Sequence, residues 1–226
     1  YSLLSATIIF VMQIKLQKVV PVPLKDKIEL RNSDVWNVEQ TFSSNDWVKI
    51  KAPSGTGKTT LIHILYKLRF DFSGTIFWDN ENCINITENK LAQYRQQKMS
   101  VIFQDLRLFQ NLTAQENIEL NRVLQKPYYE SSVIQSMAEQ LGVAHVLQQR
   151  AGLCSYGEQQ RICIIRALVQ PFEILLMDEP FSHLDNNNIS IAANLIAEEC
   201  KKRNAGFVLT DLDEDTHFNY TQKISL

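Results

Sequence analysis

The sequence has no stretch that is both long and apolar enough to cross a bilayer as a helix. The apolar run over residues 3–12, LLSATIIFVM, is too short, and it lacks the charged segment that opens a signal peptide. We expect this run to be either an extra strand or sequence ahead of the native start, because Met12 is followed at once by strand-like QIKLQKVV. Any membrane role would then come through a partner.

Cysteine, clustered basic charge and repeats are also scarce. The formal net charge is −2 and no Lys/Arg run stands out, so charge gives no reason to expect a nucleic-acid partner. The cysteines show neither C-x-x-C pairing nor metal-ligand spacing, which is typical of free thiols in a reducing compartment. They are Cys83, Cys154, Cys163 and Cys200. We find no internal repeat and no low-complexity tract.

What the sequence does have is ordinary globular composition and a phosphate-loop motif. Its 226 residues, 45% hydrophobic and 21% charged, suit one large domain with a buried core. APSGTGKTT, Ala52–Thr60, fits G-x-x-x-x-G-K-[ST] except at the first position, where alanine replaces glycine. A β-prone run precedes it and a helical pattern over 59–68 follows, which favours a phosphate site over a plain glycine turn.

Each residue type in this loop has a chemical reason to be there. Gly55 and Gly57 let backbone N–H groups curl around an anion, and the following helix adds the positive end of its dipole. Lys58 can reach the outer phosphates, and the Thr59 hydroxyl can ligate Mg²⁺.

Two further strands end on polar side chains. The strand predicted over 99–103 ends at Gln104, whose carbonyl can serve Mg²⁺ or an attacking water, although such a residue alone is usually a loop residue. The buried-type run FEILLMDEP ends on Asp178 and Glu179. Burying two carboxylates without a cation is costly, so we favour a metal and catalytic role over a solvated acidic turn. Asp178 would hold Mg²⁺ through its water shell, and Glu179 would orient the attacking water.

The remaining pattern predicts short antiparallel strands over 12–51, helices over 113–153 and a polar turn before a helix over 154–168. Ser155 and Gly157 then lie at a helix N-terminus, which favours an anion, although Ser155 taken alone is better explained as a plain N-cap.

The order of these motifs resembles the ATP-binding subunit of ABC transporters from about Met12 onward. Ala52–Thr60 resembles the family's Walker A loop, Gln104 its Q-loop and SYGEQQR its signature; ILLMDEP resembles Walker B and Ser182–Asp185 the D-loop. Residues 91–120 look most like the group that powers lipoprotein-release, macrolide-export and cell-division complexes.

The resemblance implies an α/β fold with a P-loop NTPase core and a mostly parallel sheet. It also implies an N-terminal antiparallel β-subdomain and an inserted helical subdomain. We expect a single domain over 1–226, with its core in 12–104 and 155–226 and the helical subdomain in about 105–154.

The resemblance further implies an ATPase with ATP and Mg²⁺ as cofactors, acting as a homodimer with an integral membrane permease and no nucleic acid. It would lie on the cytoplasmic face of the inner (cell) membrane, peripheral through that partner. The catalytic residues would be Glu179, Gln104, Lys58 and Asp211, and the metal ligands Thr59, Gln104 and Asp178. Nucleotide would be bound by Ser54, Gly55, Thr56, Gly57, Lys58, Thr59, Thr60, Ser155, Gly157 and Glu158.

The sequence departs from the family pattern at Ala52, at Tyr156 and Glu158 in the signature, and at Asp211. Asp211 stands where the family usually has a histidine that contacts the γ-phosphate. An ionised aspartate there would repel phosphate by on the order of a few kcal/mol, unless it points away or Thr210 compensates. This leaves open a second function, a nucleotide-dependent clamp that hydrolyses slowly or not at all.

Overall fold

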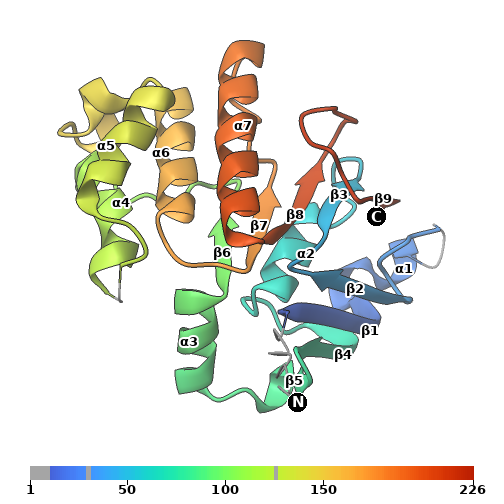
Figure 1. The fold of residues 1–226 in the computed structure, drawn as a ribbon. Helices are drawn as coiled ribbons and strands as arrows, with labels where there is room; N and C mark the ends of the chain where they lie inside the picture. Colours follow the sequence, from blue (N-terminus) through green and yellow to red (C-terminus); the bar gives the residue numbers. More distant parts are fainter. Residues whose placement is uncertain (1–10, 29–31, 125–126) are drawn as a thin grey trace, which may run out of the picture.

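A five-stranded parallel sheet in the order β6-β7-β8-β3-β9 forms the centre of the molecule (Figure 1). The computed structural model describes residues 11–28, 32–124 and 127–226, so the predicted run over 3–12 lies almost wholly outside the described residues. The strands are β3 (Trp47–Lys51), β6 (Met99–Ile102), β7 (Ile174–Asp178), β8 (Gly206–Asp211) and β9 (Gln222–Ser225).

A second, antiparallel sheet in the order β2-β1-β4-β5 packs beside the first. Its strands are β1 (Gln13–Pro21), β2 (Glu39–Ser43), β4 (Phe72–Trp78) and β5 (Glu81–Asn82), with short helical turns η1 (Val22–Leu24) and α1 (Lys25–Ile28) after β1. The prediction of antiparallel strands over 12–51 holds for β1 and β2. It is wrong for Lys25–Ile28, which form the short helix α1, and for β3, which pairs in parallel with β8 and β9.

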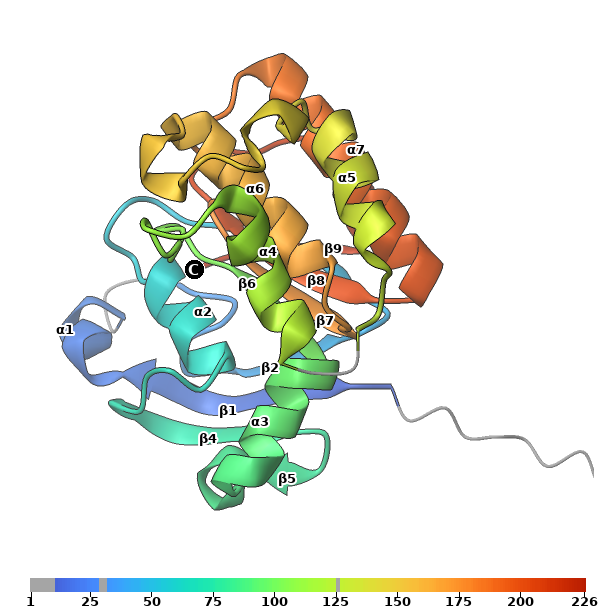
Figure 2. The same ribbon diagram turned by 90° about the vertical axis from the view of Figure 1, so that its left-hand side faces the viewer.

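Helices cover both faces of the parallel sheet, and α4 to α7 gather at the end away from the antiparallel sheet (Figures 1 and 2). The α-helices are α2 (Lys58–Leu65), α3 (Glu88–Gln97), α4 (Ala114–Val123), α5 (Ser131–Gln140), α6 (Tyr156–Leu168) and α7 (Asn186–Arg203). Single turns of 3₁₀ helix are η2 (Cys83–Asn85), η3 (Ala144–Val146) and η4 (Ala151–Leu153).

The alternation of side chains along β7 divides the interior into two cores. Leu175 and Met177 face a core under α4 to α7, while Ile174 and Leu176 face a core shared with α2 and the antiparallel sheet. All five residues of β7 are buried, because both faces of a parallel sheet are covered. The continuous apolar run therefore places Asp178 at the protected end of a central strand.

The α/β fold class predicted from the sequence is confirmed, with a parallel core, an antiparallel sheet and a helical block between β6 and β7. Within residues 11–28, 32–124 and 127–226, no helix has the length and apolarity needed to cross a membrane.

Candidate nucleotide-binding site

The loop between β3 and α2 curls around the N-terminus of α2. Gly55 has φ 76° and Gly57 has φ 109°, a left-handed conformation that favours glycine. Ala52 is fully buried and has no positive φ, so alanine costs no backbone strain there. Its N–H donates to the carbonyl of Asp211 at 3.0 Å, which ties the start of the loop to the end of β8.

Lys58, the first residue of α2, lies inside the loop and is only 5% exposed. Its Nζ donates to the carbonyls of Ala52 at 2.9 Å and Pro53 at 3.2 Å, and it lies 3.2 Å from Oε1 of Glu179. The Thr56 hydroxyl also donates to the Pro53 carbonyl, at 2.7 Å. The loop is therefore shaped by its own carbonyls, with a cation held at its centre.

Side chains that follow β6 and β7 meet beside this lysine, together with the side chain of Thr59 from α2. The Gln104 amide donates to Oε2 of Glu179 at 3.1 Å, and its Oε1 accepts from the Thr59 hydroxyl at 3.3 Å. Glu179 has φ 46°, an unfavourable angle for a residue with a side chain, and its N–H donates to the Thr210 carbonyl at 2.9 Å. Such strain concentrates at functional sites, where the surrounding structure holds the residue in place.

Asp178 is 1% exposed and has one satisfied carboxylate oxygen. Its Oδ1 accepts from the Thr210 hydroxyl at 2.9 Å, whereas its Oδ2 is buried and has no hydrogen-bond partner among the described residues. An orphaned carboxylate oxygen is expensive unless a cation or water reaches it. With the Thr59 hydroxyl and the Gln104 carbonyl it makes up an all-oxygen set, the kind that Mg²⁺ prefers.

Lys58, Thr59, Gln104 and Glu179 border an open cleft of about 300 Å³, whereas Thr56 and Asp178 are not among its lining residues. It is lined by Leu24, Ser54, Gly55, Gly57, Lys58, Thr59, Thr60, Gln104 and Glu179. Leu24 was not predicted, since nothing in its local sequence distinguishes it from a core residue. A larger apolar cleft of about 540 Å³ lies beyond the other end of α2, beside Phe70 and Ile84, and its lining lacks the phosphate loop and the acidic strand ends.

Ser155, Gly157 and Glu158 lie at the start of α6 and do not line this cleft. The Ser155 hydroxyl accepts from the Glu158 N–H at 3.3 Å, and the Glu158 carboxylate accepts from the Ser155 N–H at 2.7 Å. This reciprocal capping box was readable from the spacing S-x-x-E. A Cβ on Gly157 would lie 3.2 Å from the carbonyl of His183, so a side chain there would require the D-loop to shift by a few tenths of an ångström.

The capping interaction also governs the charge of Glu158. Burial would raise the pKa of this carboxyl, but the hydrogen bonds from Ser155 and the nearby His145 more than offset it and lower the pKa. The Glu158 carboxylate therefore stays ionised and remains hydrogen-bonded to the Ser155 N–H at the start of α6.

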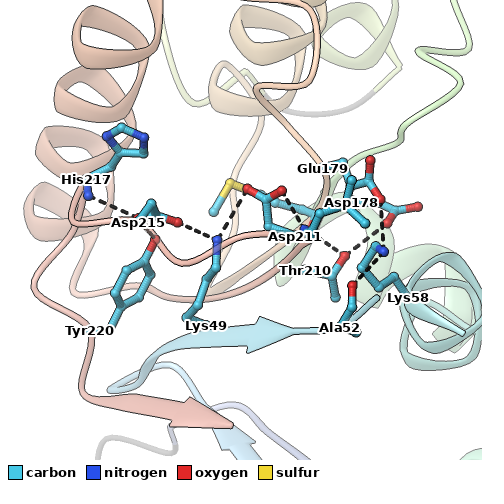
Figure 3. Close-up of polar contacts among 12 residues, drawn as sticks. Lys49, Ala52, Lys58, Asp178, Glu179, Thr210, Asp211, Asp215, His217 and Tyr220 are labelled. Atoms are coloured by element: carbon cyan, nitrogen blue, oxygen red, sulfur yellow. Dashed lines mark hydrogen bonds and ion pairs between the residues drawn. The ribbon is translucent and has the colours of Figure 1, made fainter. Parts of the chain in front are cut away.

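The Asp211 side chain points away from the cleft, which is one of the alternatives that the sequence left open. Its side chain is not part of the cleft lining, and its Oδ2 lies 3.3 Å from Nζ of Lys49 (Figure 3). Thr210 does not compensate for it either, because its hydroxyl is bound to Asp178. The nearby group that compensates is Lys49, which the sequence analysis did not name.

The ABC transporter family profile matches residues 35–182. The ABC transporter ATP-binding protein YxdL of Bacillus subtilis is 33% identical over 148 residues, covering 65% of this chain and 58% of YxdL. The lipoprotein-releasing system ATP-binding protein LolD of Legionella pneumophila is 34% identical over 180 residues, covering 78% of this chain and 79% of LolD.

Solved structures of ATP-binding cassettes have the same fold as this chain. The ATP-binding cassette MJ0796, described as a dimer in a post-hydrolysis state bound to ADP and Pi, superposes with a TM-score of 0.73 at 25% identity. The match covers 88% of both chains. A second dimeric structure of MJ0796 gives a TM-score of 0.76 at 24% identity.

The chain therefore belongs to the ABC transporter family. The sequence-based predictions of a nucleotide-binding ATPase subunit of this family are confirmed by that membership. Relatives named LolD from several bacteria also bear out the resemblance to the lipoprotein-release group.

Proposed function

We propose that the cleft at the phosphate loop binds MgATP and that Glu179 directs its hydrolysis. The observation that carries this is the set of contacts at Lys58, which meets two loop carbonyls and the Glu179 carboxylate at 2.9–3.2 Å. Carbonyls are neutral acceptors, so Glu179 supplies the negative charge at this lysine, and an incoming phosphate can take the place of that carboxylate. Gly55, Gly57 and the backbone of 54–60 would supply N–H donors, as in other phosphate loops.

Magnesium would be held by Thr59, Gln104 and Asp178, the last of which has an unpartnered, buried Oδ2. The ion would neutralise phosphate charge as bonds to the γ-phosphorus change. Gln104 already joins the two halves of this group, because its amide contacts both Thr59 and Glu179.

Glu179 is placed to orient the attacking water. It is held by Lys58 and Gln104 on its two oxygens, and its backbone is fixed to Thr210. When phosphate occupies Lys58, the carboxylate loses that partner and gains the ability to accept a proton from water. Glu179 would thus act as general base, and Lys58 would stabilise charge on the transferred phosphoryl group.

The proposed active unit contains two copies of this chain. Ser155, Gly157 and the adjoining D-loop lie outside the cleft of their own copy, so they are available to close the cleft of another. The dimeric state described for the related cassette MJ0796 supports this arrangement. Glu158 would then act indirectly, by holding Ser155 at the helix start.

An integral membrane permease is the proposed partner, as the name of the LolD relatives suggests for a lipoprotein-releasing system. We propose that the chain binds it at the cytoplasmic face of the membrane, through the segment after Gln104, where Phe109 is 61% exposed. Recovery of an integral membrane protein with the tagged chain would support this. Recovery of ribosomes or nucleic acid in its place would refute it.

The test of hydrolysis uses Glu179→Gln, which keeps the shape of the side chain and removes its charge. With the membrane partner present, we expect phosphate release to fall by about 100-fold or more while MgATP binding is kept. Glu214→Gln is a matched control, since that carboxylate is solvent-exposed and pairs with Lys51. Equal phosphate release by the wild type and Glu179→Gln would refute the role of Glu179. Binding without any release in the wild type would identify a non-hydrolysing clamp.

A further inference from the structure

A second buried lysine, Lys49, lies on β3 three residues ahead of the phosphate loop. It is 2% exposed, and its Nζ pairs with Asp211 at the end of β8 and with Asp215 in the segment that follows (Figure 3). Lys49 is not part of the proposed hydrolysis. It nevertheless lies on the strand that leads directly into the phosphate loop.

Asp211 links this lysine to the cleft. Its carbonyl accepts the N–H of Ala52, the first residue of the loop, and its neighbour Thr210 holds both Asp178 and the Glu179 backbone. The Asp211 side chain turns the other way, with Oδ1 accepting from the Leu212 N–H at 2.7 Å and Oδ2 facing Lys49. An acidic side chain thus lies at the edge of a phosphate site with its charge directed at a lysine.

Asp215 is held differently. It is 10% exposed and accepts from the Tyr220 hydroxyl at 2.5 Å and from the His217 N–H at 3.0 Å, in addition to Lys49. In Figure 3 it lies on the far side of Lys49 from Lys58. Asp215 would therefore keep its place without the lysine, whereas Asp211 would retain only its contact with the adjacent Leu212 N–H.

We propose that Lys49 is a positioning residue for nucleotide binding: it holds the Asp211 carboxylate away from the cleft and offsets part of its negative charge there. This rests on the proposed function, because it concerns the affinity of the same cleft for a polyanion. Without Lys49, the Asp211 carboxylate beside the loop loses its counter-ion, and the repulsion between like charges is expected to weaken binding about tenfold.

The test compares two double variants that carry the same net charge. Lys49→Met/Asp211→Asn keeps Asp215, and Lys49→Met/Asp215→Asn keeps Asp211. The probe is MgAMP-PNP, a non-hydrolysable ATP analogue, with its dissociation constant measured by calorimetry at low salt on the full chain. We expect the variant that keeps Asp211 to bind about tenfold more weakly than the variant that keeps Asp215, and the gap to narrow at high salt.

Equal affinity of the two double variants would overturn the proposal, since a merely structural lysine would affect both alike. The single variant Lys49→Met should bind about tenfold more weakly than the wild type. Wild-type affinity in it would also overturn the proposal; if it does not fold, the double variants still decide. A wild-type chain that fails to bind MgAMP-PNP would refute the proposed function and this inference with it, whereas a binding wild type with equal double variants refutes the inference alone.

Discussion

Lys49 and Lys58 are both buried lysines, on either side of the same loop, and they differ in the groups that compensate their positive charge. Lys58 is held by the carbonyls of Ala52 and Pro53 and shares a single carboxylate, Glu179. Lys49 is held by two carboxylates, Asp211 and Asp215. A phosphate can therefore replace the one carboxylate that pairs with Lys58, whereas the charge of Lys49 is already offset by its two carboxylates.

The difference teaches that burial alone does not mark a lysine as part of a binding site. Removing a lysine from water is costly in either place, so each needs compensation. The carbonyls around Lys58 are neutral and leave its charge available to a ligand. The two carboxylates around Lys49 offset its charge, so this lysine stabilises the fold and screens Asp211 from the neighbouring site.

The largest expected effect comes from removing the charge available to a ligand. Lys58→Met should weaken MgAMP-PNP binding by at least about 100-fold, or roughly 2.7 kcal/mol, because charge-assisted contacts to phosphate are lost. Calorimetric titration measures this directly, with circular dichroism to verify folding. If the variant binds within threefold of the wild type, Lys58 does not hold phosphate and the contrast with Lys49 collapses.

An intermediate effect is expected from removing a hydrogen bond to Asp215, one of the two carboxylates that pair with Lys49. The Tyr220 hydroxyl donates to Asp215, and burial together with this hydrogen bond raises the pKa of Tyr220, so the donor stays protonated. Tyr220→Phe should lower the free energy of unfolding by about 1–2 kcal/mol in urea titration. Tyr128→Phe is the matched control, because that ring is 43% exposed. Equal losses in the two variants would show that the hydroxyl of Tyr220 does not support the pair.

The smallest effect is expected two residues further along β3. Lys51 pairs with Glu214 at 3.0 Å, but both side chains are largely exposed, at 46% and 73%. Exposed pairs contribute little, so Lys51→Met should leave the thermal midpoint unchanged within error. A clear drop in that midpoint would mean that lysines on this strand stabilise the protein whether buried or not.

The parts of the site that could be predicted from the sequence are those carried by single stretches of chain. The loop at Ala52–Thr60 and the residues Gln104, Asp178 and Glu179 follow buried strands, and parallel strands bring such ends together. The helix cap at Ser155 was equally local, although its partner Glu158 was interpreted as a ligand contact rather than as half of a capping box.

The environment of Asp211 could not be predicted in the same way. Its counter-ion lies 162 residues earlier in the chain, and only the pairing of β3 with β8 brings the two together. Lys49 carried a weak signal of its own, since it interrupts the apolar residues of WVKIK in a strand that leads into a buried loop. A lysine in such a strand needs a counter-ion, but the sequence does not say which one.

The position of β3 between β8 and β9 has a consequence for synthesis. Both neighbours of this strand come from residues 206–225, whereas the phosphate loop that β3 leads into spans residues 52–60 and is therefore synthesised long before them. Long-range pairings of this kind form late. During synthesis on the ribosome, more than a hundred further residues must be added before β3 can pair with β8 and the loop can take its folded shape. We therefore expect that nascent chains ending before β8 are not retained on immobilised ATP.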